Sequence, residues 1–360
     1  RDSHATPAPR PKDQQQSTSQ DRRNDYDVTN TIQVSSPEAV RNAVHALYVE
    51  TFPGASFDKI WLAFHDFERL FTGNYPGYLG CDTTYHDMQH SLDMTLALTR
   101  LIIGYERSAD KDQRLGAERA QMAIITSLFH DSGYIRHEDR DQEFDNGAAF
   151  TMQHVSRGAD FLRRYLPDIG MAGSAAVSSV IVHFTGYEVD VSDIQLDDPR
   201  DVLCGQMVGT ADLIAQMADR CYLEKCRDRL YKEFVLGGVA IESATPGDYF
   251  VRYNSGTDLL KKTPIFYQQV TRERLQNQFN RAYQHLEVLF DGRNPYIDAI
   301  KKNINHLIRV LQEDDWRLLR RNPPFFVSSA DTVRKIDDLV EAQLASVPPD
   351  VYYTAKVSTG

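Results

Sequence analysis

The sequence lacks features that would place it in several classes of protein. It has no uninterrupted apolar run of about 18 residues, so no transmembrane helix is predicted. Its four cysteines form no Cys-x-x-Cys pair, which argues against a zinc ribbon or a disulfide framework and fits a reducing compartment such as the cytoplasm. Because the first residue is Arg1 rather than Met, a processed or exported form stays open.

An excess of positive charge is also lacking. The chain has 40 basic and 51 acidic residues, a net charge of −11, which argues against a protein that tracks along a nucleic-acid polymer. An acidic protein can still bind a small phosphate ester where metal cations supply positive charge locally. Small phosphorylated ligands therefore remain compatible with this composition.

Strand-like alternation is absent, and apolar residues recur at helical spacing instead. We therefore predict an all-α fold. Residues 1–30 are rich in Pro, Gln, Ser, Arg and Asp, which predicts a disordered tail. The remaining chain is divided into a core over 36–220 and C-terminal helices over 221–345 that pack on it, with no case for two independent cores.

Caps, breakers and apolar spacing predict the individual helices. One begins after Ser36 and one after Ser56. Residues 172–184 could form a strand, but their Ala and Ser content favours a tightly packed helix. The other helices are expected over about 88–105, 117–130, 147–165, 201–219, 223–236, 267–290, 296–311 and 333–344.

His130 and Asp131 stand together at the end of the apolar run 123–129. Burying an unpaired carboxylate beside an imidazole costs several kcal/mol or shifts a pKa. A metal ion removes this problem, because it pairs with the carboxylate and accepts the neutral imidazole nitrogen. We therefore predict that His130 and Asp131 bind one metal ion or two.

Further candidate ligands lie on other predicted helices. His86 and His90 are four residues apart, so a helix that spans both would place them on one face. His154 lies on the following helix, His183 ends an apolar run, and Asp212 is a carboxylate within an apolar helical stretch. Each residue alone is more often a satisfied core residue than a ligand. Their joint occurrence favours a metal cluster.

The ordered pattern of these residues resembles the HD superfamily of metal-dependent phosphohydrolases. The stretch 85–93, Tyr-His-Asp-x-x-His-Ser-x-Asp, is similar to the first motif of class I cyclic-nucleotide phosphodiesterases, Tyr-His-Asn-x-x-His-Ala-x-Asp. The resemblance covers about 85–215 and implies an HD-domain, phosphodiesterase-like helical bundle. The six ligands that it implies are His90, His130, Asp131, His154, His183 and Asp212.

The sequence also departs from these families. The second phosphodiesterase motif has a further histidine three residues after the His-Asp pair, where this chain has Tyr134. No His-Glu…Gly-Tyr-Pro run follows His183, which argues against a cyclic di-GMP phosphodiesterase of the HD-GYP kind. The stretch 154–162 looks like the equivalent helix of bacterial HD-type phosphodiesterases. The ligands of the second metal ion are therefore expected to resemble those of the bacterial enzymes more than those of the eukaryotic ones.

The resemblance implies two divalent ions, of Fe, Mn, Zn, Ni, Co or Mg, and a hydroxide that bridges them and attacks phosphorus. Asp131 would be shared by both ions, and His86 would protonate the leaving oxygen. Asp93 would orient a ligand or the acid histidine. The first ion would be held by His90, His130, Asp131 and Asp212, and the second by Asp131, His154 and His183.

Three residues are weaker candidates for substrate contact: Arg136, His137 and Gln276. For each of them, a solvated polar side chain is the more common alternative. Two alternatives for the sixth ligand also stay open. His183 could be a structural core histidine, and His137 could bind the metal in its place.

The function expected from this resemblance is hydrolysis of a small nucleotide, with a cyclic nucleotide as the expected substrate, by a binuclear metal phosphodiesterase. Homo-oligomerisation is left open. One alternative is a di-iron oxygenase, because a few HD-fold proteins, such as myo-inositol oxygenase, use the same six ligands to activate O₂. Others are a nucleotide phosphatase and a non-catalytic, metal-stabilised sensor module. His86 favours hydrolysis, since an oxygenase needs no leaving-group acid.

Overall fold

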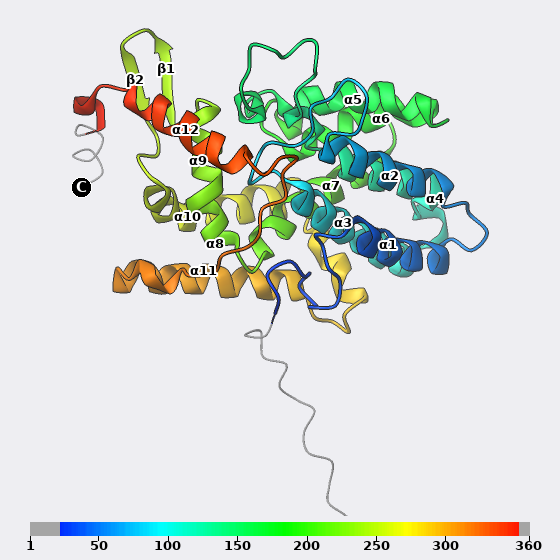
Figure 1. Cartoon of the computed structure of the whole chain (residues 1–360). Helices are drawn as coiled ribbons and strands as arrows, with labels where there is room; N and C mark the ends of the chain where they lie inside the picture. Colours follow the sequence, from blue (N-terminus) through cyan, green and yellow to red (C-terminus); the bar gives the residue numbers. More distant parts are fainter. Residues whose placement is uncertain (1–21, 353–360) are drawn as a thin grey trace, which may run out of the picture.

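The computed structural model describes residues 22–352, which are mostly helical, so the predicted all-α class is confirmed (Figure 1). The only sheet in this part of the chain is an antiparallel pair of strands, β1 and β2. The elements are α1 (Pro37–Thr51), α2 (Asp58–Thr72), α3 (Met88–Ser108), α4 (Gly116–Phe129), α5 (His154–Asp168), α6 (Ala172–Ile181), α7 (Pro199–Ala218), α8 (Tyr222–Lys225), α9 (Tyr231–Leu236), β1 (Ile241–Thr245), β2 (Asp248–Val251), α10 (Gly256–Val270), α11 (Pro295–Glu313) and α12 (Thr332–Ala345).

Helices α3 and α7 form the centre of the fold. They pack against each other, α1 and α4 cover α3, and α11 covers α7. Capping fixes where both central helices begin: the Asp87 side chain accepts a hydrogen bond from the amide of His90, and Asp198 caps α7 ahead of Pro199. These caps determine which residues of α3 and α7 face the interior.

The buried apolar side chains form one continuous core that extends from Val34 to Val347. Buried residues of the C-terminal helices α11 and α12, among them Ile300 and Ile336, belong to this core. Burying a single large apolar side chain contributes roughly 1.5–3 kcal/mol. The long helix α11 contributes Ile300, Leu307 and Val310 to this core.

The predicted tail over 1–30 is only partly within the described residues, because residues 1–21 lie outside them. Residues 22–30 are packed on the core, which corrects the prediction for this stretch. Asp27 is buried, and its carboxylate lies 2.7 Å from Nη1 of Arg100. Composition missed this segment because a buried ion pair and turn hydrogen bonds hold it, and only one aliphatic side chain, Val28, packs on the core.

Three predictions of local structure were wrong. Residues 241–251 form a hairpin, although no strand was expected, and its Ile241 and Val251 contact the core. The helix expected over 147–165 is interrupted: a 3-10 turn covers Gly147–Phe150, and α5 begins only at His154. The Thr151 hydroxyl donates to the Ala148 carbonyl, which closes the turn before the helix starts.

The helix expected over 267–290 also differs. It begins earlier, at Gly256, where the Ser255 side chain accepts a hydrogen bond from the Asp258 amide. It then continues as a π-helix over Thr271–Gln278 and ends, and a 3-10 helix follows over Ala282–Val288. Ser255 is an N-cap signal that the apolar spacing did not reveal.

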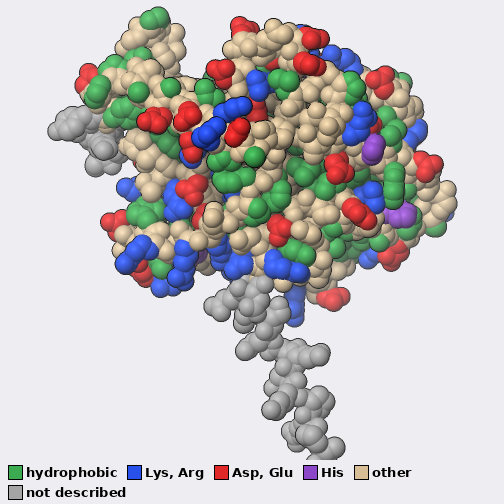
Figure 2. All heavy atoms as spheres, in the orientation of Figure 1, with side chains coloured by type: hydrophobic (Ala, Val, Ile, Leu, Met, Phe, Trp, Pro, Cys, Tyr) green, Lys and Arg blue, Asp and Glu red, His purple; other side chains and the backbone are tan. Residues whose placement is uncertain are grey.

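Figure 2 shows acidic and basic side chains interspersed over the face in view, without one continuous field of either sign. Among the described helices, none has both the length and the apolar character needed to cross a membrane. The four cysteines are all buried and unpaired with one another.

Candidate metal centre

Four side chains from separate elements converge in the interior: His90 near the start of α3, His130 and Asp131 after α4, and Asp212 in α7. Nε2 of His90 lies 2.9 Å from an Asp212 oxygen and 3.4 Å from an Asp131 oxygen. Nε2 of His130 lies 3.1 Å from the same Asp131 oxygen. These are the residues predicted to hold the first ion, and the structure brings them together.

The hydrogen bonds of the imidazoles fix which nitrogen faces the centre. Nδ1 of His130 donates to the Ser127 carbonyl at 2.7 Å, and Nδ1 of His154 donates to the Thr151 carbonyl at 2.6 Å. Since a carbonyl only accepts, each Nδ1 donates a proton, and Nε2 is the ring nitrogen left to face the centre. This is the ring orientation in which a histidine that has lost its Nε2 proton binds a metal through Nε2.

The donor set fits a divalent cation. Nε2 of His90 and Nε2 of His130 are 3.2 Å apart, and Oδ2 of Asp131 is buried without a hydrogen-bond partner. Burial would raise the pKa of Asp131 and of Asp212, but the neighbouring histidines lower both, so the two carboxylates stay ionised. Carboxylate oxygens and imidazole nitrogens are the usual ligands of Zn, Fe, Mn and related ions.

Close packing of α5 on the turn after Asp131 places the fifth predicted ligand. A Cβ at Gly133 would lie only 1.8 Å from the carbonyl oxygen of His154, so this backbone approach requires glycine. As a result, Nε2 of His154 comes within 3.7 Å of the other Asp131 oxygen, Oδ1. Asp131 therefore faces ligands of both predicted ions.

His183 is not brought to this cluster by any described contact. It lies in the 3-10 turn Val182–Thr185, and its Nδ1 is buried without a hydrogen-bond partner. The charged groups that affect its pKa are Glu188, Arg163 and Asp160, while burial lowers that pKa. Of the ligands predicted for the second ion, the structure joins Asp131 and His154 but not His183.

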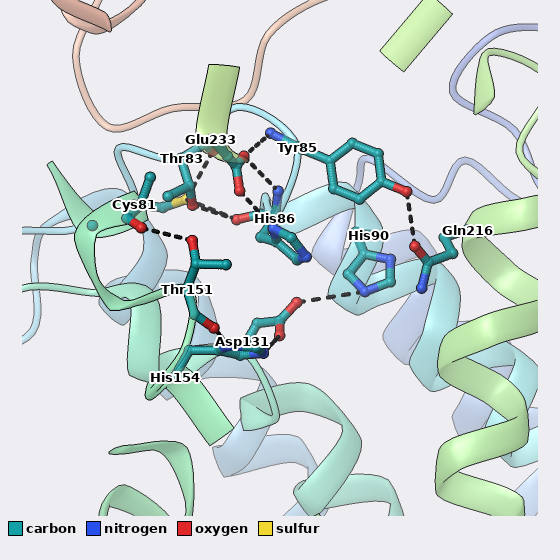
Figure 3. A network of polar contacts seen from close by, with 12 residues as sticks. Cys81, Thr83, Tyr85, His86, His90, Asp131, Thr151, His154, Gln216 and Glu233 are labelled. Carbon is teal, nitrogen blue, oxygen red and sulfur yellow. Dashed lines mark hydrogen bonds and ion pairs between the residues drawn. The ribbon is translucent and has the colours of Figure 1, made fainter. Parts of the chain in front are cut away.

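His86 faces the cluster from outside α3. The helix begins at Met88, with Asp87 as its cap, so the expected helix face shared by His86 and His90 is wrong. The two rings nevertheless lie near each other, with centroids 6.1 Å apart. Figure 3 shows His86 held on its other side by Glu233 of α9.

Glu233 is a buried site residue that the sequence did not reveal. Its Oε1 lies 2.6 Å from Nδ1 of His86, and its Oε2 accepts hydrogen bonds from the backbone amides of Tyr85 and His86. Burial alone would lower the pKa of His86, but the Glu233 carboxylate outweighs it, with help from Asp131 and Asp212, and raises that pKa to about 9. His86 is therefore protonated near neutral pH.

Two further residues, also absent from the predicted set, support the site. The ring of Tyr134 stacks on His86 and on His154, with centroid distances of 4.5 and 4.3 Å. Gln216 accepts a hydrogen bond from the Tyr85 hydroxyl at 2.8 Å and donates to the backbone carbonyl of Asp212. These contacts connect the loop that carries Tyr85 and His86 to His154 on one side and to Asp212 on the other.

A cavity of about 560 Å³ opens over Asp131, Asp212, His86 and His154. Part of its lining comes from the segment that runs from α8 through α10, which gives the C-terminal region a place at this cavity. Two basic side chains, Arg252 and Lys262, also line it. The wall is mainly aromatic: Tyr85, Tyr134, Tyr187, Tyr222, Phe234, Tyr253 and Phe266.

The remaining predicted site residues lie elsewhere. Asp93 is a buried residue of α3 near the charged groups of Asp219, Asp27 and Lys225, and burial raises its pKa to about 7. Within residues 22–352, Asp93 makes no hydrogen bond or ion pair with His86 or His90. No contact in this part of the chain therefore supports the predicted role of Asp93 in orienting either histidine.

The three candidates for substrate contact do not line the cavity. Arg136 forms an ion pair with Asp82 at 2.9 Å, and the backbone amide of His137 donates to Asp141. Gln276 is half-buried within the π-helix after α10. Their positions therefore match the structural alternatives better than a role in the cavity.

The fold and the cluster define an all-helical protein with a buried histidine–aspartate centre suited to a metal ion. The profile of the family described as Npun_R2479-like matches residues 77–309, well over half of the chain, and the protein belongs to this family. The matched range contains the cluster, Tyr134 and Glu233. No curated protein and no solved structure matches the chain significantly.

Proposed function

We propose that the protein is a metal-dependent phosphohydrolase, and specifically a phosphodiesterase that acts on a small cyclic nucleotide. One observation carries this proposal: a buried set of candidate metal ligands and a histidine held by the Glu233 carboxylate face the same cavity. His86 and Asp131 both line that cavity. Hydrolysis of a phosphate ester needs these two functions, activation of water and protonation of the leaving group.

His90, His130, Asp131 and Asp212 would hold the first ion, and Asp131 with His154 would hold the second. The bound ions would supply an activated water and neutralise charge on the phosphoryl oxygens. The carbonyls of Ser127 and Thr151 orient the imidazoles of His130 and His154 for this role. The ligands are thus held in place by the protein before any ion binds.

His86 would act as the general acid. Nδ1 of His86 contacts the Glu233 carboxylate, so the doubly protonated ring would donate its other proton, at Nε2, to the leaving oxygen. The His86 ring cannot turn freely, because Tyr134 stacks on it and because Glu233 also accepts hydrogen bonds from the backbone amides of Tyr85 and His86. Glu233 thus acts as a positioning residue for the acid.

The cavity favours a small substrate that carries an aromatic group. Its volume of about 560 Å³ suits a nucleotide rather than a polymer. Aromatic walls bind a nucleobase by stacking, while the phosphate would lie at the polar end beside Asp131 and His154. This is why a nucleotide is the substrate class that we favour.

The test is a hydrolysis screen of the metal-loaded protein against cyclic mononucleotides, cyclic dinucleotides and simple phosphomonoesters, with products separated by chromatography. We expect metal-dependent release of a 5′-nucleotide from a cyclic substrate. His130→Ala should lose both metal and activity, whereas His65→Ala, at an exposed position on α2, should keep both.

The proposal is wrong if the wild type and His130→Ala hydrolyse the whole panel equally poorly. A mixed-valent di-iron signal, with O₂ consumed alongside an organic substrate, would instead identify an oxygenase. Nucleotide binding without turnover under any metal would identify a sensor module. The protonated His86 is the feature that favours hydrolysis over both alternatives.

A further inference from the structure

A second concave site lies outside the candidate metal centre, between the 137–141 loop and the outer face of α5. Its volume is about 450 Å³, and four arginines line it: Arg140, Arg157, Arg163 and Arg164. The only carboxylates in its lining are Asp141 and Asp160. Four guanidinium groups against two carboxylates give this site a positive charge in a chain whose net charge is −11.

Two of the four arginines are already engaged by carboxylates. Arg157 lies 2.9 Å from Asp141 and also donates to the carbonyl of Gly133 at 2.7 Å. Arg163 forms an exposed ion pair with Asp160 at 2.9 Å, one turn away on the same helix. Arg157 is thus a fixed part of the wall, and Arg163 is only weakly held.

The other two arginines have no carboxylate partner in the described part of the chain. Arg140 donates to the ring of His137 at 2.8 Å, and Arg164 donates to the backbone carbonyl of Asp160 at 3.3 Å. His137 does not add a charge, because burial and the nearby Arg140 and Arg157 lower its pKa to about 4. It serves as a neutral acceptor that holds Arg140 in place.

Three of the four guanidinium groups lie close enough to one neighbouring residue, Tyr78, to influence it together. The rings of Tyr78 and His137 pack with centroids 4.5 Å apart, and Arg140, Arg157 and Arg164 all act electrostatically on Tyr78. Like charges gathered in a concave site repel one another, so this arrangement is stabilised when an anion enters. The planar fork of an arginine matches the oxygens of a phosphate group.

We propose that this arginine-lined cavity is a binding site for a phosphate-bearing small molecule, separate from the metal centre. Arg140 and Arg164 supply the free guanidinium groups, and Arg157 forms the fixed wall between them. The proposal is independent of the phosphohydrolase activity, because none of these side chains belongs to the His–Asp cluster.

The test is calorimetric titration of the full chain, freed of metal by a chelator and then dialysed, with inorganic pyrophosphate. We expect saturable binding that weakens when salt is raised from about 50 to about 200 mM. Arg140→Gln/Arg164→Gln should bind about tenfold more weakly or worse, since both charge-assisted contacts are lost. Arg309→Gln, an exposed arginine on α11, is the matched control and should bind like the wild type.

His130→Ala separates this site from the metal centre and should bind pyrophosphate as the wild type does. Both substituted arginines are exposed, so the double variant is expected to fold, which circular dichroism and thermal unfolding check. Absence of saturable binding by the wild type at millimolar pyrophosphate would overturn the proposal. Equal affinity of the double variant and the wild type would also overturn it, as would loss of binding in His130→Ala.

Discussion

Nδ1 of His86 lies 2.6 Å from Oε1 of Glu233, although the two residues are 147 positions apart in the chain. This contact joins the loop before α3 to α9 across the cavity. The same carboxylate binds the amides of Tyr85 and His86, so it fixes both the position and the protonation of the imidazole. The proposed general acid therefore depends on a residue far outside the first motif.

Glu233→Gln tests this dependence. The amide keeps the shape of the side chain but removes the charge that favours protonated His86. We expect kcat for a nucleotide substrate to fall about 100-fold, with KM little changed. For a p-nitrophenyl phosphodiester the loss should be much smaller, since p-nitrophenolate leaves without a proton. Steady-state kinetics on the two substrates provides the measurement.

The control is Glu224→Gln on α8, another buried carboxylate, which accepts a hydrogen bond from the Arg321 amide. It should leave the ratio of the two rates unchanged. An equal loss for both substrates in Glu233→Gln would contradict an acid role for His86 and would indicate a purely structural effect.

Metal binding should stabilise the folded protein. A ligand that binds only the folded state at 100 times its Kd adds about 2.7 kcal/mol to the free energy of unfolding. We expect the melting temperature to rise when Mn²⁺ or Zn²⁺ is added to chelator-treated protein, and no such rise in His130→Ala. Calorimetric melting curves with and without metal provide the measurement, and a rise of the same size in the variant would refute the assigned ligands.

His154 and His183 should differ in their effect on metal content. Nε2 of His154 lies 3.7 Å from Asp131, whereas no described contact joins His183 to the cluster. We expect His154→Ala to lower the number of bound ions per chain, and His183→Ala to leave it unchanged. Elemental analysis of the metal-loaded variants decides between them. Loss of an ion in His183→Ala would restore it as a ligand.

Gly133→Ala should destabilise the protein strongly. The new Cβ would meet the carbonyl oxygen of His154 at 1.8 Å, so α5 or the turn after Asp131 has to move. Forced overpacking of this kind costs roughly 1–3 kcal/mol or more. Gly173→Ala in α6 is the matched control, because its Cβ meets nothing within 4 Å and should be neutral or stabilising. Urea unfolding measures both, and equal stability of the two variants would contradict the close packing.

The buried pair of Asp27 and Arg100 should make stability fall in acid. Burial raises the pKa of Asp27, but Arg100 and several hydrogen bonds outweigh it, so its pKa in the folded protein lies below the usual value for an aspartate, 3.8. A carboxyl group with a depressed pKa stabilises the fold above its unfolded pKa, and this contribution is lost as the pH falls through the folded value. The free energy of unfolding should therefore decrease below about pH 4.

Asp27→Asn checks the same pair at neutral pH. It leaves the Arg100 guanidinium buried without its carboxylate, which costs about 3–5 kcal/mol. The variant should be less stable than the wild type at pH 7, and its stability should change less between pH 5 and pH 3. Urea titrations at these pH values measure both effects. A variant as stable as the wild type at pH 7 would show that the pair contributes little.

The site residues that could be predicted from the sequence are those that stand out within their own helix. His130 and Asp131 end an apolar helix, and Asp212 interrupts another, so each is conspicuous without knowledge of its neighbours. The all-α class followed from apolar spacing for the same reason. A polar residue within an apolar helical run is visible in the sequence. Because such a helix is buried, this residue must find a hydrogen-bond or ionic partner in the interior.

The remaining features depend on contacts between distant segments. Glu233 is one carboxylate in a short helix, and only the packing of α9 brings it to His86. His183 stands at a helix end, where the direction of a side chain depends on the turn that follows. The Asp27–Arg100 pair orders a segment whose composition alone indicates disorder.

The part of the cavity lining that comes from the segment that runs from α8 through α10 has a consequence for how the protein can diversify. The predicted ion ligands all precede residue 213, while Phe234, Tyr253 and Phe266 come later in the chain. Substitutions at these three aromatic positions would therefore reshape the cavity wall without replacing any of the predicted ion ligands. The two parts of the site can change separately in the sequence, with the exception of Glu233, which holds His86.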